Sequence, residues 1–155
     1  MALPRGITIE NGRLYQRPVR EIEQYRSNKV ECKCVFLDGV HTLEGIQGRT
    51  VDMEITIRPK DKEKGFQKFA VWFAQNEKYR TSVSFRPYES ALKIDRKCSG
   101  SRRAFIYQRR SLVNTNDGEQ VLTATVMTDV AANGISFGAD GQVEMDITKY
   151  DLFEE

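Results

Sequence analysis

The sequence VDMEITIR, residues 51–58, decides the fold class of this chain. Its apolar and polar residues alternate without a break, and the apolar positions are Val51, Met53, Ile55 and Ile57. Neighbouring side chains of a β-strand point to opposite faces, so this period of two predicts a strand with one buried face and one face in water. A half-buried helix would instead carry apolar residues three or four positions apart.

The same strand pattern recurs along the rest of the chain. Residues 30–36 and 79–85 alternate in the same way, and 69–73, which is apolar at every position, predicts a central strand covered on both faces. Further short strands are predicted at 92–94, 121–126, 135–137 and 143–147. Many short strands at spacings of about ten residues predict an all-β fold, an antiparallel two-sheet β-sandwich of the concanavalin or lectin-like kind.

Turn residues separate the predicted strands. The turn signals are Asn11-Gly12, Asp38-Gly39, Asn116-Asp117-Gly118, Asn133-Gly134 and Asp140-Gly141. Residues 59–68 are expected to form a charged loop, and only 18–27 could form one or two turns of helix. No linker or repeat divides the chain, so residues 1–155 are predicted to form a single domain.

The charge and composition argue against several classes of protein. A net charge of +2 creates no strong field toward nucleic acid or anionic lipid. No apolar run reaches the roughly 20 residues that span a bilayer, and residues 1–5 lack the apolar segment of a secretory signal. Four arginines bracket the aromatic run at 105–107, a pattern that can bind nucleic acid but that also protects strand edges. They are Arg102, Arg103, Arg109 and Arg110. We therefore expect no nucleic-acid partner and no membrane partner.

The chain has three cysteines, Cys32, Cys34 and Cys98, and a single histidine, His41. An odd count without the spacing of a disulfide framework favours reduced thiols and a cytoplasmic location. Cys32 and Cys34 would point to the same face of a strand, and such close neighbours fit disulfide geometry poorly. The three cysteines and His41 match none of the structural zinc spacings, so we expect no metal ion and no cofactor.

The residues by themselves indicate no catalytic site. Glycoside hydrolysis needs two carboxylates in a cleft, and Glu144 and Asp146 share one face of a predicted strand, but the alternation puts that face in water. His41 is expected in an exposed loop, with no serine or cysteine motif beside it. The sequence Gly45-Ile46-Gln47-Gly48 lacks the Lys-Ser/Thr pair that would complete a phosphate-binding loop.

Aromatic residues offer a different kind of site. Five of them could stack on sugar rings, although the aromatic residues of a sandwich more often belong to its core. They are Trp72, Phe73, Tyr79, Phe85 and Tyr88. Tyr79 and Tyr88 are the candidates for carbohydrate binding, because we expect them to be more exposed than Trp72.

Leu3-Pro4-Arg5 followed by NGRLYQRPVREIE at 11–23 resembles the entry into the C-terminal β-sandwich of glycoside hydrolase family 32. That family comprises invertases, sucrose-6-phosphate hydrolases, levanases and inulinases. Three later segments are similar to the same module, in the family's order. They are the segment that starts at Phe69 and ends in SALKIDRKCSG, NDGEQVLT at 116–123 and NGISFGADGQVEMDITKYDL at 133–152. The four segments together span nearly the whole chain.

The resemblance implies a division of labour. In this family an N-terminal five-bladed propeller holds all the catalytic carboxylates, and the sandwich packs against it. We expect residues 1–155 to contain no propeller, because the chain has no Asp-Pro pair and so lacks the family's nucleophile motif and its Arg-Asp-Pro motif. The Glu31-Cys32 dipeptide matches that of the family's general acid, but it follows the entry into the sandwich instead of preceding it, so we interpret it as a coincidence.

The chain is therefore expected to be a non-catalytic accessory module of a sucrose- or fructan-hydrolysing enzyme, a β-fructofuranosidase or a sucrose-6-phosphate hydrolase. The implied partners are the propeller, fructose-containing sugars and a second copy of the chain. The second copy would bind through the apolar patch that is bare in the isolated chain, where the propeller should sit. Two alternatives stay open: a lectin-like module that holds fructans through Tyr79 and Tyr88, and an enzyme that uses carboxylates of its own. Residues 102–115 depart from the family, because about two strands' worth of sequence is missing or replaced there.

Overall fold

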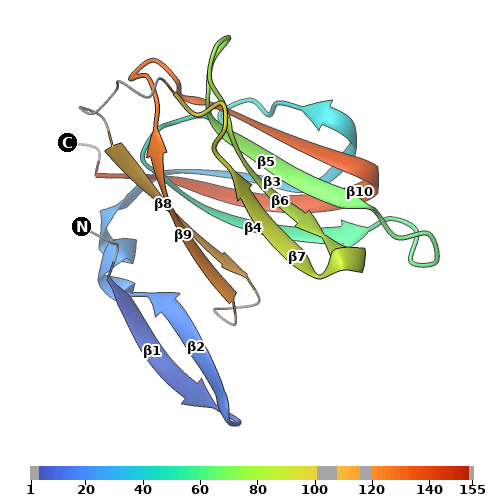
Figure 1. Ribbon diagram of the computed structural model, residues 1–155, viewed down its shortest axis with the longest axis horizontal. Helices are drawn as coiled ribbons and strands as arrows, with labels where there is room; N and C mark the ends of the chain where they lie inside the picture. Colours follow the sequence, from blue (N-terminus) through green and yellow to red (C-terminus); the bar gives the residue numbers. More distant parts are fainter. Residues whose placement is uncertain (1–3, 101–107, 116–119, 154–155) are drawn as a thin grey trace.

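The computed structural model describes residues 4–100, 108–115 and 120–153, and its long elements are all strands (Figure 1). In chain order, the strands and two short 3₁₀ helices are β1 (Arg5–Glu10), β2 (Arg13–Pro18), the helix η1 (Arg20–Tyr25), β3 (Arg26–His41), β4 (Val51–Pro59), β5 (Lys68–Gln75), β6 (Thr81–Arg86), the helix η2 (Pro87–Glu89), β7 (Ala91–Asp95), β8 (Gln108–Thr115), β9 (Gln120–Met127) and β10 (Gly134–Leu152). The pairings of these strands are all antiparallel, so the prediction of an all-β antiparallel sandwich is confirmed.

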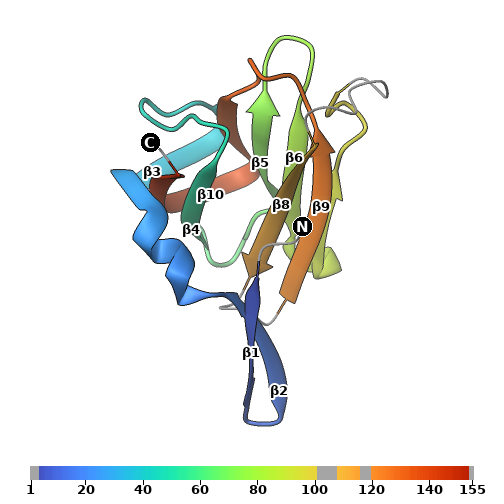
Figure 2. The same ribbon diagram turned by 90° about the vertical axis from the view of Figure 1, so that its left-hand side faces the viewer.

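The long strand β10 organises the sandwich. Its first half, residues 134–140, pairs with β5, and its second half, residues 143–151, pairs with β4. Strand β3 runs beside both halves, and β6 and β7 extend the sheet beyond β5. The two halves of this bent sheet enclose one hydrophobic core, and Figure 2 shows β3, β4 and the end of β10 on one side with β5 and β6 on the other.

The core contains side chains from both halves of β10. Phe137, Val143 and Met145 are all 0% exposed, as is Leu37 of β3. On β5, Phe69 and Val71 belong to this core, and Ala70 on the opposite face is 1% exposed. The prediction of a central strand at 69–73, covered on both faces, is therefore confirmed.

The turn signals of the sequence have two different outcomes. Asn11-Gly12 forms the predicted two-residue hairpin, with both residues at positive φ (51° and 76°) and Glu10 paired with Arg13. Asp38-Gly39 and Asp140-Gly141 lie inside β3 and β10, and the prediction of turns there is wrong. Gly39 pairs with Ala139, next to the register shift in β10, and Gly39 and Gly141 have φ of 86° and 103°. The two strands thus bend side by side where the sheet folds over.

A bulge in β3 overturns one expectation about its faces. Val35 pairs with Met145 and Cys32 with Ile147, so two residues of β3 lie opposite Asp146, and Cys34 has φ 55°. The extra residue inverts the alternation. Cys32 therefore packs against the core while Cys34 is exposed, and the prediction that they share a face is wrong.

The short helix and the charged loop are confirmed as η1 and as the connection between β4 and β5. Strand β8, at 108–115, pairs with β9, so part of the compressed region 102–115 does form a strand. Residues 101–107, which include Arg102, Arg103 and the aromatic run at 105–107, lie outside the described residues, as does the turn signal at 116–118. Within the described ranges, no helix is long and apolar enough to cross a membrane.

Candidate functional site

The hairpin β1–β2 projects away from the sandwich (Figures 1 and 2), and it carries an exposed apolar face. Ile9 pairs with Leu14, and Ile7 lies two residues before Ile9, so the three side chains share one face of the hairpin. They are among the most exposed large apolar residues of the described chain, at 66% for Ile7, 74% for Ile9 and 50% for Leu14. Since apolar side chains gathered on one face often mark a contact with another protein surface, this face is a candidate interface.

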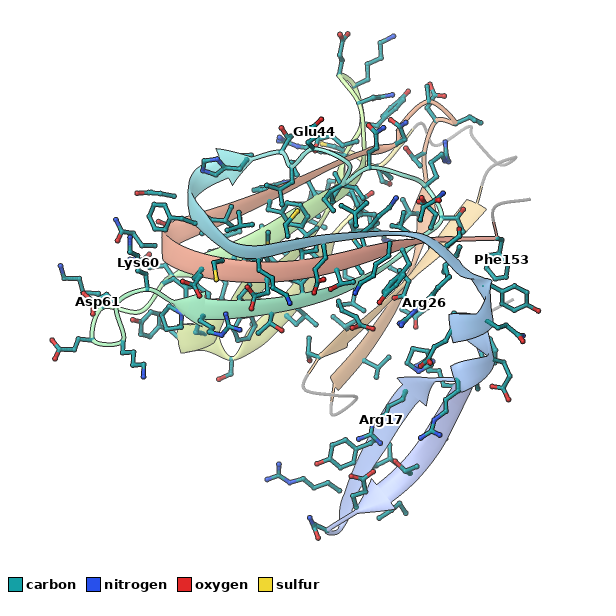
Figure 3. All side chains as sticks on the ribbon, turned by 180° about the vertical axis from the view of Figure 1, so that it is seen from behind. Arg17, Arg26, Glu44, Lys60, Asp61 and Phe153 are labelled. Carbon is teal, nitrogen blue, oxygen red and sulfur yellow. The ribbon has the colours of Figure 1, made fainter. Side chains whose placement is uncertain are left out.

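The opposite face of the hairpin is polar and is satisfied within the hairpin itself. Arg17 donates to the carboxylate of Glu10 at 2.9 Å and to the hydroxyl of Thr8 at 3.1 Å, and its guanidinium lies 5.1 Å from the centre of the Tyr15 ring (Figure 3). At the base of the hairpin, on the same face as Ile7, Arg5 donates to Gln16 of β2 and also to Thr123 of β9, outside the hairpin. An isolated two-stranded hairpin is marginal in water, so these contacts help to hold its shape while the apolar face stays open.

The two tyrosines predicted to bind carbohydrate do not lie together. Tyr79 precedes β6 and is half-buried, whereas Tyr88 follows β6 and is 73% exposed. The six residues of β6 separate them by about 20 Å, too far for one sugar-stacking platform. Tyr88 lines an apolar groove with Ile57 and Phe85, and its hydroxyl donates to the carbonyl of Lys64 at 3.1 Å. The other aromatic candidates, Trp72, Phe73 and Phe85, are half-buried.

The carboxylates considered for catalysis are engaged in ion pairs and hydrogen bonds with neighbouring residues. Arg58 lies 3.3 Å from Glu144 and 2.5 Å from Asp146, and Asp146 also accepts the N–H of the bulged residue Cys34 at 2.8 Å. The hydrogen bond from Cys34, followed by that from Arg58, lowers the pKa of Asp146 below its ordinary value. The hydrogen bond from Lys33 and the charges of Lys29 and Lys33 likewise lower the pKa of Glu31. A general acid of a glycosidase needs the opposite shift.

Protonation of Asp146 should therefore lower the free energy of unfolding as the pH falls into the acid range. A carboxylate whose pKa is lowered on folding stabilises the fold above its unfolded value, near 3.8, and this stabilisation is lost as the pH falls further. We expect the urea midpoint of Asp146→Asn to fall less than that of the parent when the pH is lowered from neutral to about 3. The control is Glu44→Gln, in an exposed loop, which should track the parent. Equal losses in the parent and Asp146→Asn would contradict the role of Asp146.

The histidine and the cysteines lie apart from these sites. His41 is exposed, as predicted, but it ends β3 instead of lying in a loop, and its ring Nε2 lies 2.9 Å from the carbonyl of Asp38. The three thiols are free, with Cys34 and Cys98 exposed and Cys32 partly buried. In the part of the chain that the structure describes, no group of three histidine, cysteine or acidic side chains is placed to hold a metal ion.

A polar pocket that sequence reasoning missed lies at one end of the sandwich. Its volume is about 350 Å³, and its walls come from four distant segments: Asn28 and Val30; Gly45, Gln47 and Gly48; Asn133; and Lys149 with Asp151. One signal in the sequence could have found it. Lys149 occupies an inward position of β10, in phase with Val143, Met145 and Ile147, where the pattern calls for an apolar residue. The exposed face of β1 was missed although GITIE, residues 6–10, alternates like a strand.

Comparison with known proteins identifies relatives of this chain. The profile of the family described as "Glycosyl hydrolases family 32 C terminal" matches residues 21–112. A curated relative, a sucrose-6-phosphate hydrolase from Staphylococcus xylosus, is 27% identical over 173 residues, and the match covers 98% of this chain. The chain spans only 34% of that relative's length.

Solved structures share the fold. An exo-inulinase from Aspergillus awamori matches with a TM-score of 0.75 at 16% identity, over 97% of this chain and 35% of that one. Fructan 1-exohydrolase IIa from Cichorium intybus matches with a TM-score of 0.77 at 16% identity, over 97% of this chain and 40% of that one. At these identities the likeness establishes the fold alone, and the matched region is again a minor part of a longer chain.

Proposed function

Because this chain belongs to the family of C-terminal domains of glycoside hydrolase family 32, we propose that it is the non-catalytic accessory module of a sucrose- or fructan-hydrolysing enzyme. The parent activity is that of a β-fructofuranosidase or a sucrose-6-phosphate hydrolase. Its catalytic carboxylates belong to an N-terminal five-bladed propeller, for which the remaining two thirds of the curated relative's length leave room. The three free thiols support a cytoplasmic location for this enzyme.

The observation that carries the accessory role is the apolar face of β1–β2. Ile7, Ile9 and Leu14 are at least half exposed, and the hairpin extends beyond the sandwich, where a neighbouring domain can reach it. Burying a side chain of this size fully contributes about 1.5–3 kcal/mol. We propose that this face packs on the propeller of the parent enzyme and keeps the two domains in one fixed arrangement.

The triple variant Ile7→Thr, Ile9→Thr and Leu14→Thr tests this packing in the parent enzyme. Threonine keeps a high strand propensity, so the hairpin should persist while its apolar face is lost. We expect the half-life of the sucrose-hydrolysing activity during incubation at elevated temperature to fall at least about tenfold. Loss of even one such contact is worth more than about 1.4 kcal/mol. In the isolated chain, the same substitutions should leave the urea midpoint nearly unchanged, since the side chains are already exposed.

A matched control replaces two exposed apolar residues outside the hairpin, Val40→Thr and Val130→Thr, which are 66% and 53% exposed. Those changes should leave the parent enzyme's half-life intact. If the hairpin variant and the valine variant behave alike, the hairpin is not the interface, and the accessory role loses its main support.

A second candidate is a lectin-like module that holds fructans through aromatic side chains. The observation that favours it is Tyr88, which is 73% exposed and lines an apolar groove. Tyr79 supports it less, because it is half-buried and lies beyond the other end of β6. Sugar bound at Tyr88 would shift the NMR signals of amides around η2, which lie apart from the polar pocket lined by Asn28 and Lys149.

A further inference from the structure

The pocket beneath Gly45 to Gly48 has a buried ion pair as its floor. Lys149 is only 4% exposed, and its ammonium lies 2.5 Å from the carboxylate of Asp151, two residues further along the same face of β10. An ammonium has three N–H donors. Among the described residues, the ion-pair partner of the Lys149 ammonium is Asp151. A buried charge needs further hydrogen-bonding partners, so this floor favours a ligand with oxygen atoms.

The roof is the segment Gly45-Ile46-Gln47-Gly48, which the sequence excluded as a phosphate-binding loop. The N–H of Gly48 donates to the carbonyl of Asn133 at 2.9 Å, and Gln47 forms a β-bridge with Gly134, which fixes the roof over β10. Gly48 has φ 141°, and a Cβ there would lie 2.6 Å from Val51 and 3.3 Å from the Asp151 carboxylate. The glycine therefore lets the backbone approach the ion pair closely.

The rim of the pocket consists of exposed amide side chains from three distant segments. They are Asn28, Gln47 and Asn133. Each amide offers both donors and an acceptor, and the ion pair adds donors from Lys149 and acceptors from Asp151. The summed formal charge of the lining is zero. A phosphate would meet the Asp151 carboxylate and a cation would meet Lys149, whereas a neutral molecule with several hydroxyl groups can pair with the amides of Gln47 and Asn133 and with both members of the ion pair.

We propose that this pocket binds a neutral sugar, one fructosyl unit of sucrose or a fructan. Its volume of about 350 Å³ lies at the low end for small-molecule sites, which suits a single sugar ring. The neutral, hydroxyl-rich ligand class follows from the pocket itself, and the choice of fructose rests on the proposed function of the parent enzyme. The site is distinct from the Tyr88 groove, whose lining residues are entirely different.

The test is an NMR titration of the isotope-labelled chain with D-fructose, sucrose and, separately, inorganic phosphate. Both sugars should shift the backbone amides of Asn28 and Gly48 and the side-chain amides of Gln47 and Asn133, saturably and at concentrations up to about 100 mM. Phosphate should cause no such shifts. Gln47→Ala and Asn133→Ala, at exposed positions that are safe for folding, should each weaken binding about fivefold. Gln142→Ala, an exposed amide of β10 outside the pocket, should leave the affinity unchanged.

Several results would overturn the proposal. These are the absence of saturable sugar shifts, shifts centred on Tyr88, stronger shifts with phosphate, or affinities that Gln47→Ala and Asn133→Ala leave unchanged. The outcome is independent of the hairpin experiment, because sugar binding is measured on the chain alone and domain packing on the parent enzyme. A sugar-binding pocket without hairpin packing would leave a carbohydrate-binding module, and the reverse would leave an accessory domain without a sugar site.

Discussion

Replacing Phe137 by alanine will lower the free energy of unfolding by about 3–5 kcal/mol, the usual cost of deleting a fully buried phenylalanine ring. Phe137 is 0% exposed and lies where β10 pairs with β5 on one side and with the end of β3 on the other. The loss combines the transfer free energy of the ring with the cavity that it leaves, because the strands on both sides restrict collapse. A loss of this size is a large share of a typical domain's stability.

Urea denaturation followed by fluorescence or circular dichroism measures this loss. Phe137→Leu, which leaves a smaller cavity, keeps the comparison available if Phe137→Ala does not fold. Phe36→Ala is the matched control, since Phe36 is 43% exposed on the outer face of β3 and its ring lies 4.1 Å from the Lys60 ammonium. We expect the smallest loss for Phe36→Ala and the largest for Phe137→Ala. A reversed order would mean that the bulge at Cys34 does not set the faces of β3 as described.

Replacing Gly141 by valine will destabilise the chain by at least about 2 kcal/mol, because a β-branched residue is forced to positive φ. Gly141 has φ 103°, and a Cβ there would lie 3.0 Å from the Cα of Phe66 and 3.1 Å from its Cβ. Since one of these contacts is with backbone, the loop before β5 would have to move as well. The substitution thus strains the backbone at the bend where β10 passes from one half of the sheet to the other.

The comparison for Gly141 is Gly6, on β1, where a Cβ would meet no atom within 4 Å. Gly6→Val should cost little, and it could stabilise the strand through better β-propensity. Gly141→Ala should fall between the two valine variants in urea midpoint. Equal midpoints for Gly141→Val and Gly6→Val would show that the bend tolerates an ordinary side chain and is not a fixed feature of the fold.

The strands themselves could be predicted from the sequence because their signals are local. The alternation at 51–58 needs only neighbouring residues, and it reappears as β4, whose inner residues Met53, Ile55 and Ile57 pack against the core. Asn11-Gly12 is similar, since both residues tolerate the positive φ of a two-residue hairpin. The apolar run at 69–73 predicted a central strand, because it is short, lies among other strand patterns, and a strand covered on both faces is apolar at every position.

The same kind of signal failed at 38–39 and 140–141, and the reason is tertiary. Asp-Gly favours a chain reversal when it is read alone, but in the fold each dipeptide lies on a strand whose partner bends beside it. The position of a bulge likewise cannot be predicted from the residues next to it in the sequence. Cys34 is displaced because Asp146, far away in the sequence, accepts its N–H and holds it there. That contact reverses the faces of Val35 and Phe36.

The sequence by itself therefore determined the fold class, the central strand and the first hairpin, since these depend on side-chain period and backbone preference within a few residues. Only the tertiary structure decided which faces stay open and which polar groups meet. The apolar side of β1–β2 is a candidate interface because no described part of the chain covers it. The pocket exists because Asn28, Gln47, Asn133 and Lys149 are brought together by pairings between distant strands, and a hydrogen-bonding site of this kind has no local signature.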